Sequence, residues 1–353
     1  MTEAALQNRS PAAGLPGSGP QRYLPGLALS AAVAVAAVLA APPIARIFPI
    51  PAMVIALLIG IALNPLASRP VFEPGLTFCV KKLLRVAVAL LGIRIALADI
   101  VSLGPGIVLV TVLAMTITLI SGFLIARFFG QNASYGALAG AATAVCGASA
   151  TLATATVVPN YKGKEADIAF VVVAVNALST VAMVLYPPLC VWLGFDAQAT
   201  GAMLGATIHD VAQVVGAGYA VSEEVGNTAV IVKLFRVFLL LPVVLAVGWW
   251  FTRQGAEHGA AKVPLPVFAL AFLALCLVNS AAPYLPALAP VYVPIKAVLV
   301  ETATWGLLIA IGALGLGTSM SAIAQLGYRH VATVTATTIV ILVVATAGVL
   351  AIG

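Results

Sequence analysis

The segment GAMLGATIHDVAQVVGAGYA, residues 201–220, combines a membrane-compatible composition with two ionisable residues at its centre, His209 and Asp210. About 20 such residues are enough to cross the hydrocarbon core of a bilayer. A charged side chain at the centre of that core costs roughly 2.5–3.5 kcal/mol on insertion scales. We therefore expect neighbouring segments to supply the groups that compensate this pair.

The composition is that of an all-α, polytopic helical membrane protein. Of the 353 residues, 62% are hydrophobic and 8% are charged, whereas soluble domains carry about 25% charged residues. The basic residues behind the net charge of +6 are scattered, so they do not indicate nucleic-acid binding. The four cysteines form no CxxC or Cys/His cluster, and no P-loop pattern occurs, so we expect no metal, no cofactor and no ATP-driven pump.

The chain divides into a polar tail and a transmembrane domain. Residues 1–22 are rich in Pro, Gly, Ala and Ser and predict a disordered cytoplasmic tail, and residues 23–353 form the transmembrane domain. The first apolar run begins only near Leu24, so we expect no cleaved signal peptide. Eleven apolar segments follow, at 24–47, 50–67, 82–101, 106–129, 134–158, 166–194, 199–220, 226–252, 265–282, 292–317 and 331–351. The Gly-rich fifth and seventh segments either span the membrane or are re-entrant.

The distribution of basic residues predicts the orientation in the membrane. If all eleven segments span, ten Lys and Arg lie on one side and three on the other. The positive-inside rule then places the N-terminus in the cytoplasm and the C-terminus outside. Lys162 and Lys164 do not fit this scheme, and a re-entrant fifth segment would return them to the cytoplasmic side. Residues 90–104 and 313–327 echo each other, which favours inverted repeats.

The segment at 141–158 is built almost entirely of small residues. Small residues allow helices to pack closely in a membrane, which is one interpretation. The other is a broken helix, whose free N–H groups and hydroxyls from Ser149, Thr151 and Thr154 would hold an anion at a positive helix end.

Two neighbouring segments supply further candidates. Gln213 shares a helical face with His209, and Thr207 shares one with Asp210. The pair His209 and Asp210 is suited to accept a proton, to donate to a substrate, or to balance a cation. Lys233 and Arg236 supply such cations, and we expect them either to pair with Asp210 or to face an anionic substrate; Lys233 could instead snorkel.

Several motifs resemble the sulfate exporter family of conserved bacterial inner-membrane proteins, whose substrate is unproven. They are LLGIRIALADI (90–100), AVCGASATLA (144–153), GATIHDVAQVVGAG (205–218), IVKLFRVFLLLPV (231–243) and ALGLGTSM (313–320). Thr151 departs from the aliphatic residue expected after CGASA. The resemblance implies a multi-pass transporter in the inner membrane, and kinship with bile-acid and sodium/proton-antiporter carriers in which two broken helices cross at the midplane.

These observations favour a secondary transporter that exports sulfate or a related sulfur oxyanion by alternating access, and not an enzyme. The alternatives are an ion-coupled carrier of another small organic anion, and a channel-like or structural membrane protein. The expected partners are a small anion and the lipid bilayer. The sequence leaves open whether the chain also forms a homo-oligomer. The candidate substrate-binding residues are Cys146, Gly147, Ser149, Thr151, Thr207, Gln213, Lys233 and Arg236, and the candidate coupling residues are His209 and Asp210.

Overall fold

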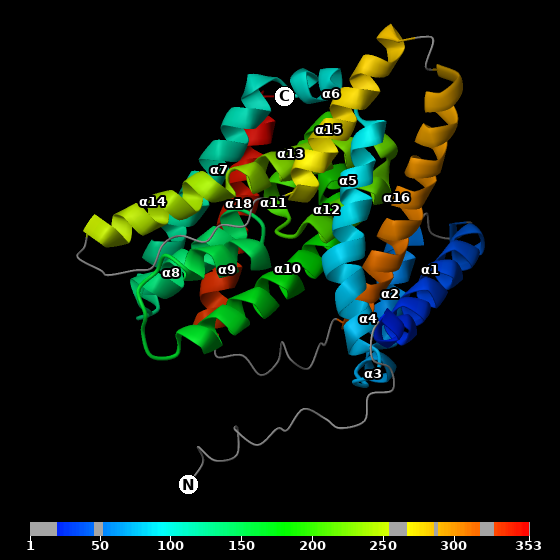
Figure 1. Cartoon of the computed structure of the whole chain (residues 1–353). Helices are drawn as coiled ribbons and strands as arrows, with labels where there is room; N and C mark the ends of the chain where they lie inside the picture. Colours follow the sequence, from blue (N-terminus) through cyan, green and yellow to red (C-terminus); the bar gives the residue numbers. More distant parts are fainter. Residues whose placement is uncertain (1–19, 46–51, 254–266, 286–288, 318–327, 353) are drawn as a thin grey trace.

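The computed structural model describes residues 20–45, 52–253, 267–285, 289–317 and 328–352, and within these ranges all regular structure is helical (Figure 1). This confirms the all-α prediction, whereas the tail before residue 20 lies outside the described ranges. Seven helical stretches are long and apolar enough to cross a membrane: Gln21–Ile44, Gly104–Phe128, Lys164–Trp192, Glu223–Arg253, Val267–Tyr284, Ala289–Gly317 and Tyr328–Ile352.

The third predicted segment is displaced. It was expected at 82–101, but the observed helix begins at Glu73 and runs through α4 (Glu73–Phe78), a π-helical turn η2 (Cys79–Leu83) and α5 (Leu84–Leu91). The predicted start is wrong because the helix continues through the exposed Lys81 and Lys82. The chain continues through the short helices η3 (Gly92–Arg94) and α6 (Leu97–Ser102).

The helices form two bundles (Figure 1). In the scaffold bundle, α16 packs against α1, α2 and α5, and α5 also packs against α15. In the hairpin bundle, α7 packs against α8 and α18, and α13 packs against α11 and α12. The scaffold bundle consists of α1 (Leu24–Ala45), α2 (Ala52–Ala62), α4, α5, α15 (Val267–Ala281) and α16 (Ala289–Gly317). The hairpin bundle consists of α7 (Gly104–Phe128), α8 (Ala133–Ala144), α9 (Ala148–Ala155), α10 (Lys164–Trp192), α11 (Ala197–Thr207), α12 (Val211–Val221), α13 (Glu223–Phe238), α14 (Leu240–Arg253) and α18 (Tyr328–Ile352).

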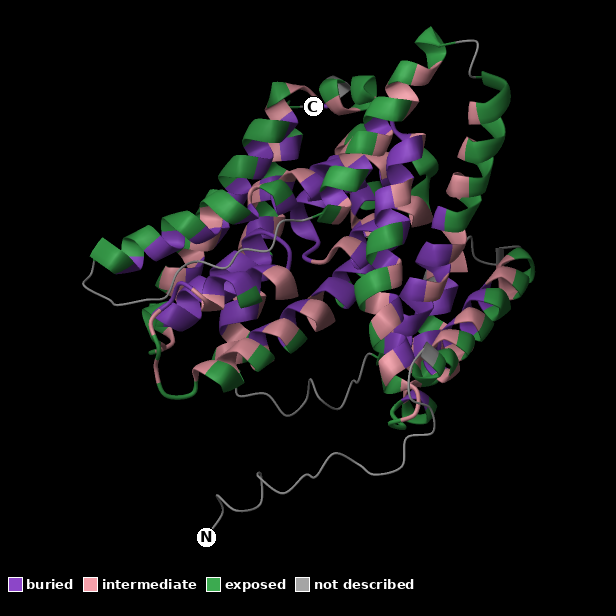
Figure 2. Cartoon of the chain, viewed as in Figure 1, coloured by how far each residue is buried: buried purple, intermediate pink, exposed green. Residues whose placement is uncertain are grey.

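Glycines bring these helices into close contact. A Cβ atom on Gly122 of α7 would lie 2.5 Å from the carbonyl oxygen of Gly136 in α8. In the scaffold bundle, a Cβ on Gly60 of α2 would lie 2.6 Å from the carbonyl oxygen of Gly312 in α16. Backbones approach this closely in membranes when small residues lie at the interface. Buried residues accordingly concentrate inside the hairpin bundle and between the bundles (Figure 2).

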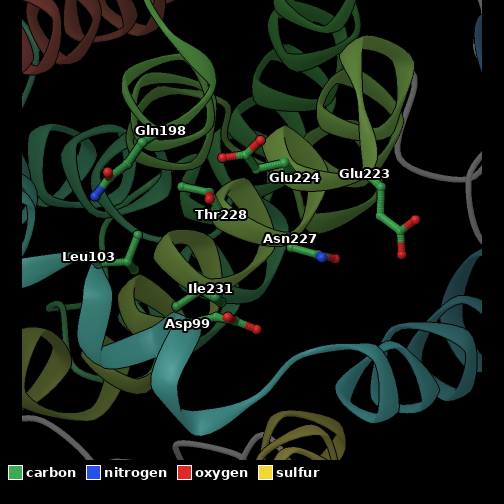
Figure 3. A pocket seen from close by; sticks show the side chains of 8 residues that line it. All are labelled: Asp99, Leu103, Gln198, Glu223, Glu224, Asn227, Thr228 and Ile231. Atoms are coloured by element: carbon green, nitrogen blue, oxygen red, sulfur yellow. The ribbon is translucent and has the colours of Figure 1, made fainter.

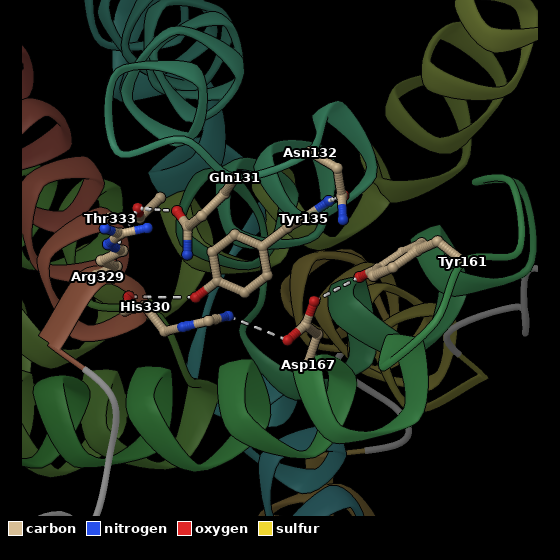
Figure 4. A network of polar contacts seen from close by, with 8 residues as sticks. All are labelled: Gln131, Asn132, Tyr135, Tyr161, Asp167, Arg329, His330 and Thr333. Atoms are coloured by element: carbon tan, nitrogen blue, oxygen red, sulfur yellow. Dashed lines mark hydrogen bonds and ion pairs between the residues drawn. The ribbon is translucent and has the colours of Figure 1, made fainter.

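The fifth segment is a re-entrant hairpin. The Tyr135 hydroxyl, in the first turn of α8, donates to the carbonyl of His330 in α18 (3.1 Å), and His330 Nε2 lies 3.2 Å from Asp167 Oδ1 in α10. After α9, the Tyr161 hydroxyl donates to the same Asp167 carboxylate (2.8 Å; Figure 4). Burial and this hydrogen bond raise the pKa of Tyr161, so the phenol stays protonated and donates. Both ends of α8–α9, the first hairpin, thus lie on one side, here called the first side.

The seventh segment is a second hairpin, α11–α12, which enters from the opposite side. A Cβ on Gly201 would contact Thr228, and one on Gly205 would contact the carbonyl of Ala229, so α11 runs parallel to α13. A Cβ on Gly218 would lie 2.8 Å from Cα of Gly226, so α12 returns toward the start of α13. The α13 helix begins on the second side, because α10 crosses the bundle from Asp167 before α11 starts.

The arrangement has an inverted order, since each hairpin is followed by a long helix that runs in the opposite direction to its counterpart. The sequence echo at 90–104 and 313–327 stays a prediction, because residues 318–327 lie outside the described ranges. The re-entrant first hairpin places Lys162 and Lys164 on the first side together with Arg329, whereas Glu223 and Glu224 lie on the second side. Under the positive-inside rule, this distribution predicts a cytoplasmic first side.

Candidate functional site at the hairpin tips

The tips of the two hairpins meet inside the hairpin bundle. The first tip is residues 145–147, between α8 and α9, and the second tip is residues 208–210, between α11 and α12. Gly147 has φ +62°, a conformation that favours glycine, and a Cβ on it would lie 3.8 Å from the carbonyl oxygen of His209. The predicted broken helices are therefore present, and the ionisable pair His209 and Asp210 lies where their tips meet.

Arg236 joins both hairpins through its guanidinium group. Nε donates to the carbonyl of Ala144 (3.1 Å), and Nη2 donates to the carbonyls of Thr143 and Ala144 (each 2.9 Å). Nη1 donates to the carbonyls of Gly205 (2.9 Å) and Ile208 (3.0 Å). A guanidinium has five N–H groups, so every donor of this fully buried side chain is directed at a backbone carbonyl.

Lys233 makes the same kind of link one turn earlier in α13. Its Nζ donates to the carbonyls of Val145 (2.6 Å) and Ile208 (3.1 Å), and also to that of His209. The side chain is 0% exposed. In the described part of the chain, neither Lys233 nor Arg236 forms an ion pair with Asp210. In this conformation the two side chains can offer a substrate their charge, but no free donor.

The acceptors of these bonds explain why two cations are buried here. The carbonyls lie at the C-terminal ends of α8 and α11, where the helix dipole places about half a negative charge. Because the tips are buried, those carbonyls would otherwise lack partners at considerable cost. Lys233 and Arg236 therefore stabilise both hairpins. The bonded carbonyls belong to Thr143, Ala144 and Val145 in the first hairpin and to Gly205, Ile208 and His209 in the second.

The N-terminal ends at the same tips differ. Asp210 caps α12, since its Oδ1 accepts from the backbone N–H of Ala212 (2.8 Å) and its own N–H donates to Ser179 Oγ (3.1 Å). The α9 helix begins after Gly147, which has no side chain to act as a cap. The positive end of α12 thus already has a carboxylate, whereas the positive end of α9 has none.

His209 is buried with one ring nitrogen bonded. Its Nε2 lies 2.9 Å from Thr338 Oγ1, and that hydroxyl donates to the carbonyl of Val334 (2.8 Å). A hydroxyl has a single proton to donate, so Thr338 accepts here and Nε2 is the protonated nitrogen. Among the described residues, Nδ1 has no hydrogen-bond partner. The lone pair of the ring therefore lies at Nδ1.

The other predicted residues lie close to the tips, with different degrees of engagement. Thr151 and Thr207 donate to carbonyls of their own helices, those of Gly147 (3.1 Å) and Met203 (2.7 Å). Gln213 Nε2 lies 3.5 Å from Thr180 Oγ1, and its buried Oε1 has no partner within the described chain. Cys146 is buried in the first tip, and Ser149 is half-buried in the first turn of α9.

Comparison with known proteins identifies the family. The family model described as "Conserved hypothetical protein 698" matches residues 25–334. The chain is 40% identical over 332 residues to the UPF0324 membrane protein TauZ of Paracoccus pantotrophus, covering 93% of this chain and 95% of the relative. It is 41% identical over 334 residues to a UPF0324 membrane protein of Rhizobium meliloti (94% of each chain), and 39% identical over 323 residues to one of Chlorobaculum tepidum (90% and 87%). The chain belongs to this family. The relatives' names describe UPF0324 proteins as membrane proteins, which agrees with the multi-pass bundle.

Two residues that hold the site in this UPF0324 protein were not identified from the sequence. Ser179 of α10 accepts from the Asp210 backbone, and Thr338 of α18 fixes the His209 ring. Both lie in apolar segments beside other hydroxyl residues, Thr180 next to Ser179 and Thr337 next to Thr338, so no local pattern distinguishes them. The carbonyl acceptors of Lys233 and Arg236 could not be predicted from the sequence either, because every residue carries a backbone carbonyl.

A separate cavity lies on the second side (Figure 3). Its volume is about 360 Å³, and it contains none of the predicted site residues. Next to it, Arg94 Nη1 lies 3.6 Å from Glu223 Oε1, and Arg94 Nη2 donates to Thr304 Oγ1 (2.8 Å). Arg94 thereby connects the scaffold bundle with α13 of the hairpin bundle. The residues lining the cavity are Asp99, Leu103, Gln198, Glu223, Glu224, Asn227, Thr228 and Ile231.

Proposed function

We propose that this UPF0324 protein is a secondary transporter of a small inorganic anion, sulfate or a related sulfur oxyanion, and that it exports this anion by alternating access. The proposal rests on one observation above all, which is that two opposed hairpins meet at tips that carry an excess of positive charge. In this proposal the protein is a carrier and not an enzyme. We further propose that it lies in the bacterial inner membrane with its first side in the cytoplasm.

The charges at the tips favour an anion. Lys233 and Arg236 contribute two formal positive charges, and Asp210 contributes one negative charge, so one positive charge is in excess. Isolated buried charge is costly in a low-dielectric interior. Within the hairpins, each helix break adds one positive and one negative dipole end, which cancel to first order. A bound anion would therefore lower the electrostatic energy of the tips.

The start of α9 is the best-suited place for that anion. Its first turn presents backbone N–H groups at a positive helix end, as anion sites at helix N-termini do. The half-buried Ser149 hydroxyl adds a donor there, whereas Thr151 and Thr207 already donate to their own helices. Cys146 and Gly147 would form the wall of this site.

The two bundles supply the moving parts. Arg94, Thr304 and Glu223 join them on the second side, so release of this contact would open a path there. The unpartnered Nδ1 of His209 and the carboxylate of Asp210 would take up the coupling proton. Inverted repeats with binding at the midplane are the usual construction of such carriers.

A flux assay tests this function. The full chain is reconstituted into lipid vesicles, and uptake of labelled sulfate, sulfite and a small organic anion is measured with and without a pH gradient. We expect concentrative, gradient-driven uptake of a sulfur oxyanion, and loss of the pH effect in His209→Ala. Uptake that only equilibrates would indicate a channel, and uptake of the organic anion alone would reassign the substrate. If no anion moves under any gradient, the proposal is wrong.

Ser149→Ala tests the location of the site. Losing a hydrogen bond to a charged ligand costs about 1.5 kcal/mol, so we expect the KM for the anion to rise roughly tenfold. Ser121→Ala is the matched control, because Ser121 is also half-buried but donates within α7 to the carbonyl of Thr118 (2.7 Å). Equal KM values in the two variants would exclude the start of α9.

A further inference from the structure

The ammonium group of Lys233 has the surroundings of a bound cation. Its three acceptors are all backbone carbonyls, and they come from both hairpins: Val145 on one side, and Ile208 and His209 on the other. We call these three oxygens the carbonyl cage. No carboxylate of the described chain forms an ion pair with Nζ. The ammonium is thus held by the unwound backbone between two half-helices.

Unwound carbonyls and half-helix C-terminal ends are the groups that coordinate a coupling cation in many carriers with broken helices. Carbonyl oxygens replace the hydration shell of a monovalent ion in the same manner in channels. The carbonyl cage has this chemistry, but its centre is taken by Nζ, which is covalently attached to α13. The hairpins are therefore joined without a diffusible ion.

The fit of Lys233 is set by the packing of its own helix. A Cβ on Gly205 of α11 would lie 2.5 Å from the carbonyl oxygen of Ala229 and 2.8 Å from Cβ of Val232 in α13. This close approach places α13 next to the second tip, so the side chain of Lys233 is long enough to reach the carbonyls of both tips. Arg236 occupies the neighbouring carbonyls of Ala144 and Gly205, which leaves those of Val145 and His209 to Lys233.

We propose that Lys233 is a tethered substitute for a coupling cation, so that the hairpin tips need no Na⁺, and that removing its side chain converts the carbonyl cage into a binding site for a small monovalent cation. For transport, the inference rests on the function proposed above and predicts a carrier that is independent of sodium. For the carbonyl cage itself, the inference concerns cation binding, which can be measured without transport.

Thermal unfolding of the purified full chain tests the cage. Wild type, Lys233→Ala and Lys233→Met are compared in NaCl, LiCl, KCl, methylammonium chloride and choline chloride at equal ionic strength. We expect the wild-type Tm to be the same in all five salts. Lys233→Ala should be destabilised, and Na⁺ or methylammonium should raise its Tm saturably by at least ~2 °C over choline. Lys233→Met fills the space with an uncharged chain and should show no such rise.

Lys82→Ala is the matched control, since Lys82 is an exposed lysine on η2. It should behave as wild type in every salt. A wild-type Tm that rises specifically with Na⁺, or a Lys233→Ala protein that responds to no cation, overturns the proposal. If Lys233→Ala cannot be purified in folded form, wild-type uptake decides: sodium-dependent uptake contradicts the proposal, and equal uptake in Na⁺ and choline supports it. Absence of uptake in every medium counts against the transport function, whereas the Tm comparison addresses the cage alone.

Discussion

The two hairpins are alike where their first half-helices, α8 and α11, end at the tips. They differ where their second half-helices, α9 and α12, begin. Lys233 and Arg236 bind three carbonyls at the end of α8 and three at the end of α11. At the starts of the following half-helices, Asp210 caps α12, whereas α9 follows an uncapped glycine. The shared feature is structural, and the difference marks the first hairpin as the one that has a positive end available to a ligand.

The largest effect is expected from removing the shared feature. Arg236→Ala leaves carbonyls of both hairpins without donors, and each buried acceptor left without a partner costs about 1–3 kcal/mol. We expect little folded protein, as measured by size-exclusion chromatography of a fluorescent fusion. Arg127→Ala, at an exposed position near the end of α7, is the control and should fold normally. A well-folded Arg236→Ala would show that the hairpins do not depend on this link.

A smaller effect on stability, but loss of transport, is expected at the first tip. Gly147→Ala introduces a Cβ at φ +62° and ψ −124°, a backbone region that residues other than glycine rarely adopt, which costs about 1–3 kcal/mol. Gly130→Ala is the matched control, because Gly130 has φ +72° far from the tips. Both variants should lower Tm, and only Gly147→Ala should reduce anion uptake. Equal uptake would mean that the conformation of the first tip has no functional role.

At the second tip, Thr338→Val removes the acceptor of His209 Nε2. A buried donor without a partner costs about 1–3 kcal/mol, and a freed ring can also reorient, so we expect a loss near 1 kcal/mol in unfolding free energy. Thr116→Val, whose hydroxyl is exposed and bonded within α7, is the comparison. Chemical denaturation measures both. A Thr338→Val protein as stable as Thr116→Val would show that His209 does not need this contact.

The smallest effect on stability is expected for Asp210→Asn, because asparagine also caps helices. Its consequence is functional, since the variant cannot bind a coupling proton at this position. We expect a Tm close to that of wild type, and uptake that no longer responds to a pH gradient. Asp196→Asn, at the cap of α11 where Oδ1 accepts from Ala199 N (2.7 Å), controls for capping and should keep the pH response. An unaltered response in Asp210→Asn would remove this residue from the coupling mechanism.

The sequence was sufficient to predict the helical bundle and the broken segments, because long apolar runs and clustered small residues follow directly from bilayer physics. It also predicted an interior position for Arg236 correctly, whereas for Lys233 it left snorkelling open. It left the direction of the fifth segment open, and only the contacts of Tyr135, Tyr161 and Asp167 showed that both ends lie on one side.

The groups that compensate the buried charges at the tips could not be predicted from residue types. A cation is one of the predicted partners of Asp210, but its carboxylate caps a helix, and the cations bind carbonyls instead. Side-chain partners such as Thr338 depend on how distant helices pack, which no local pattern encodes. The prediction of the third segment failed for a related reason, since Lys81 and Lys82 are tolerated within a helix that packs in the scaffold bundle.

The link between Arg236 and the first tip also constrains how the protein is made. The guanidinium lies 92 residues after Ala144, whose carbonyl it binds. At synthesis rates of about 5–20 residues per second, the first hairpin is synthesised roughly 5–20 s before its stabilising partner. During that interval the nascent chain carries unpaired carbonyls within the bilayer or the insertion machinery. Chains that terminate before α13 is complete are therefore the ones that membrane quality-control proteases should remove first.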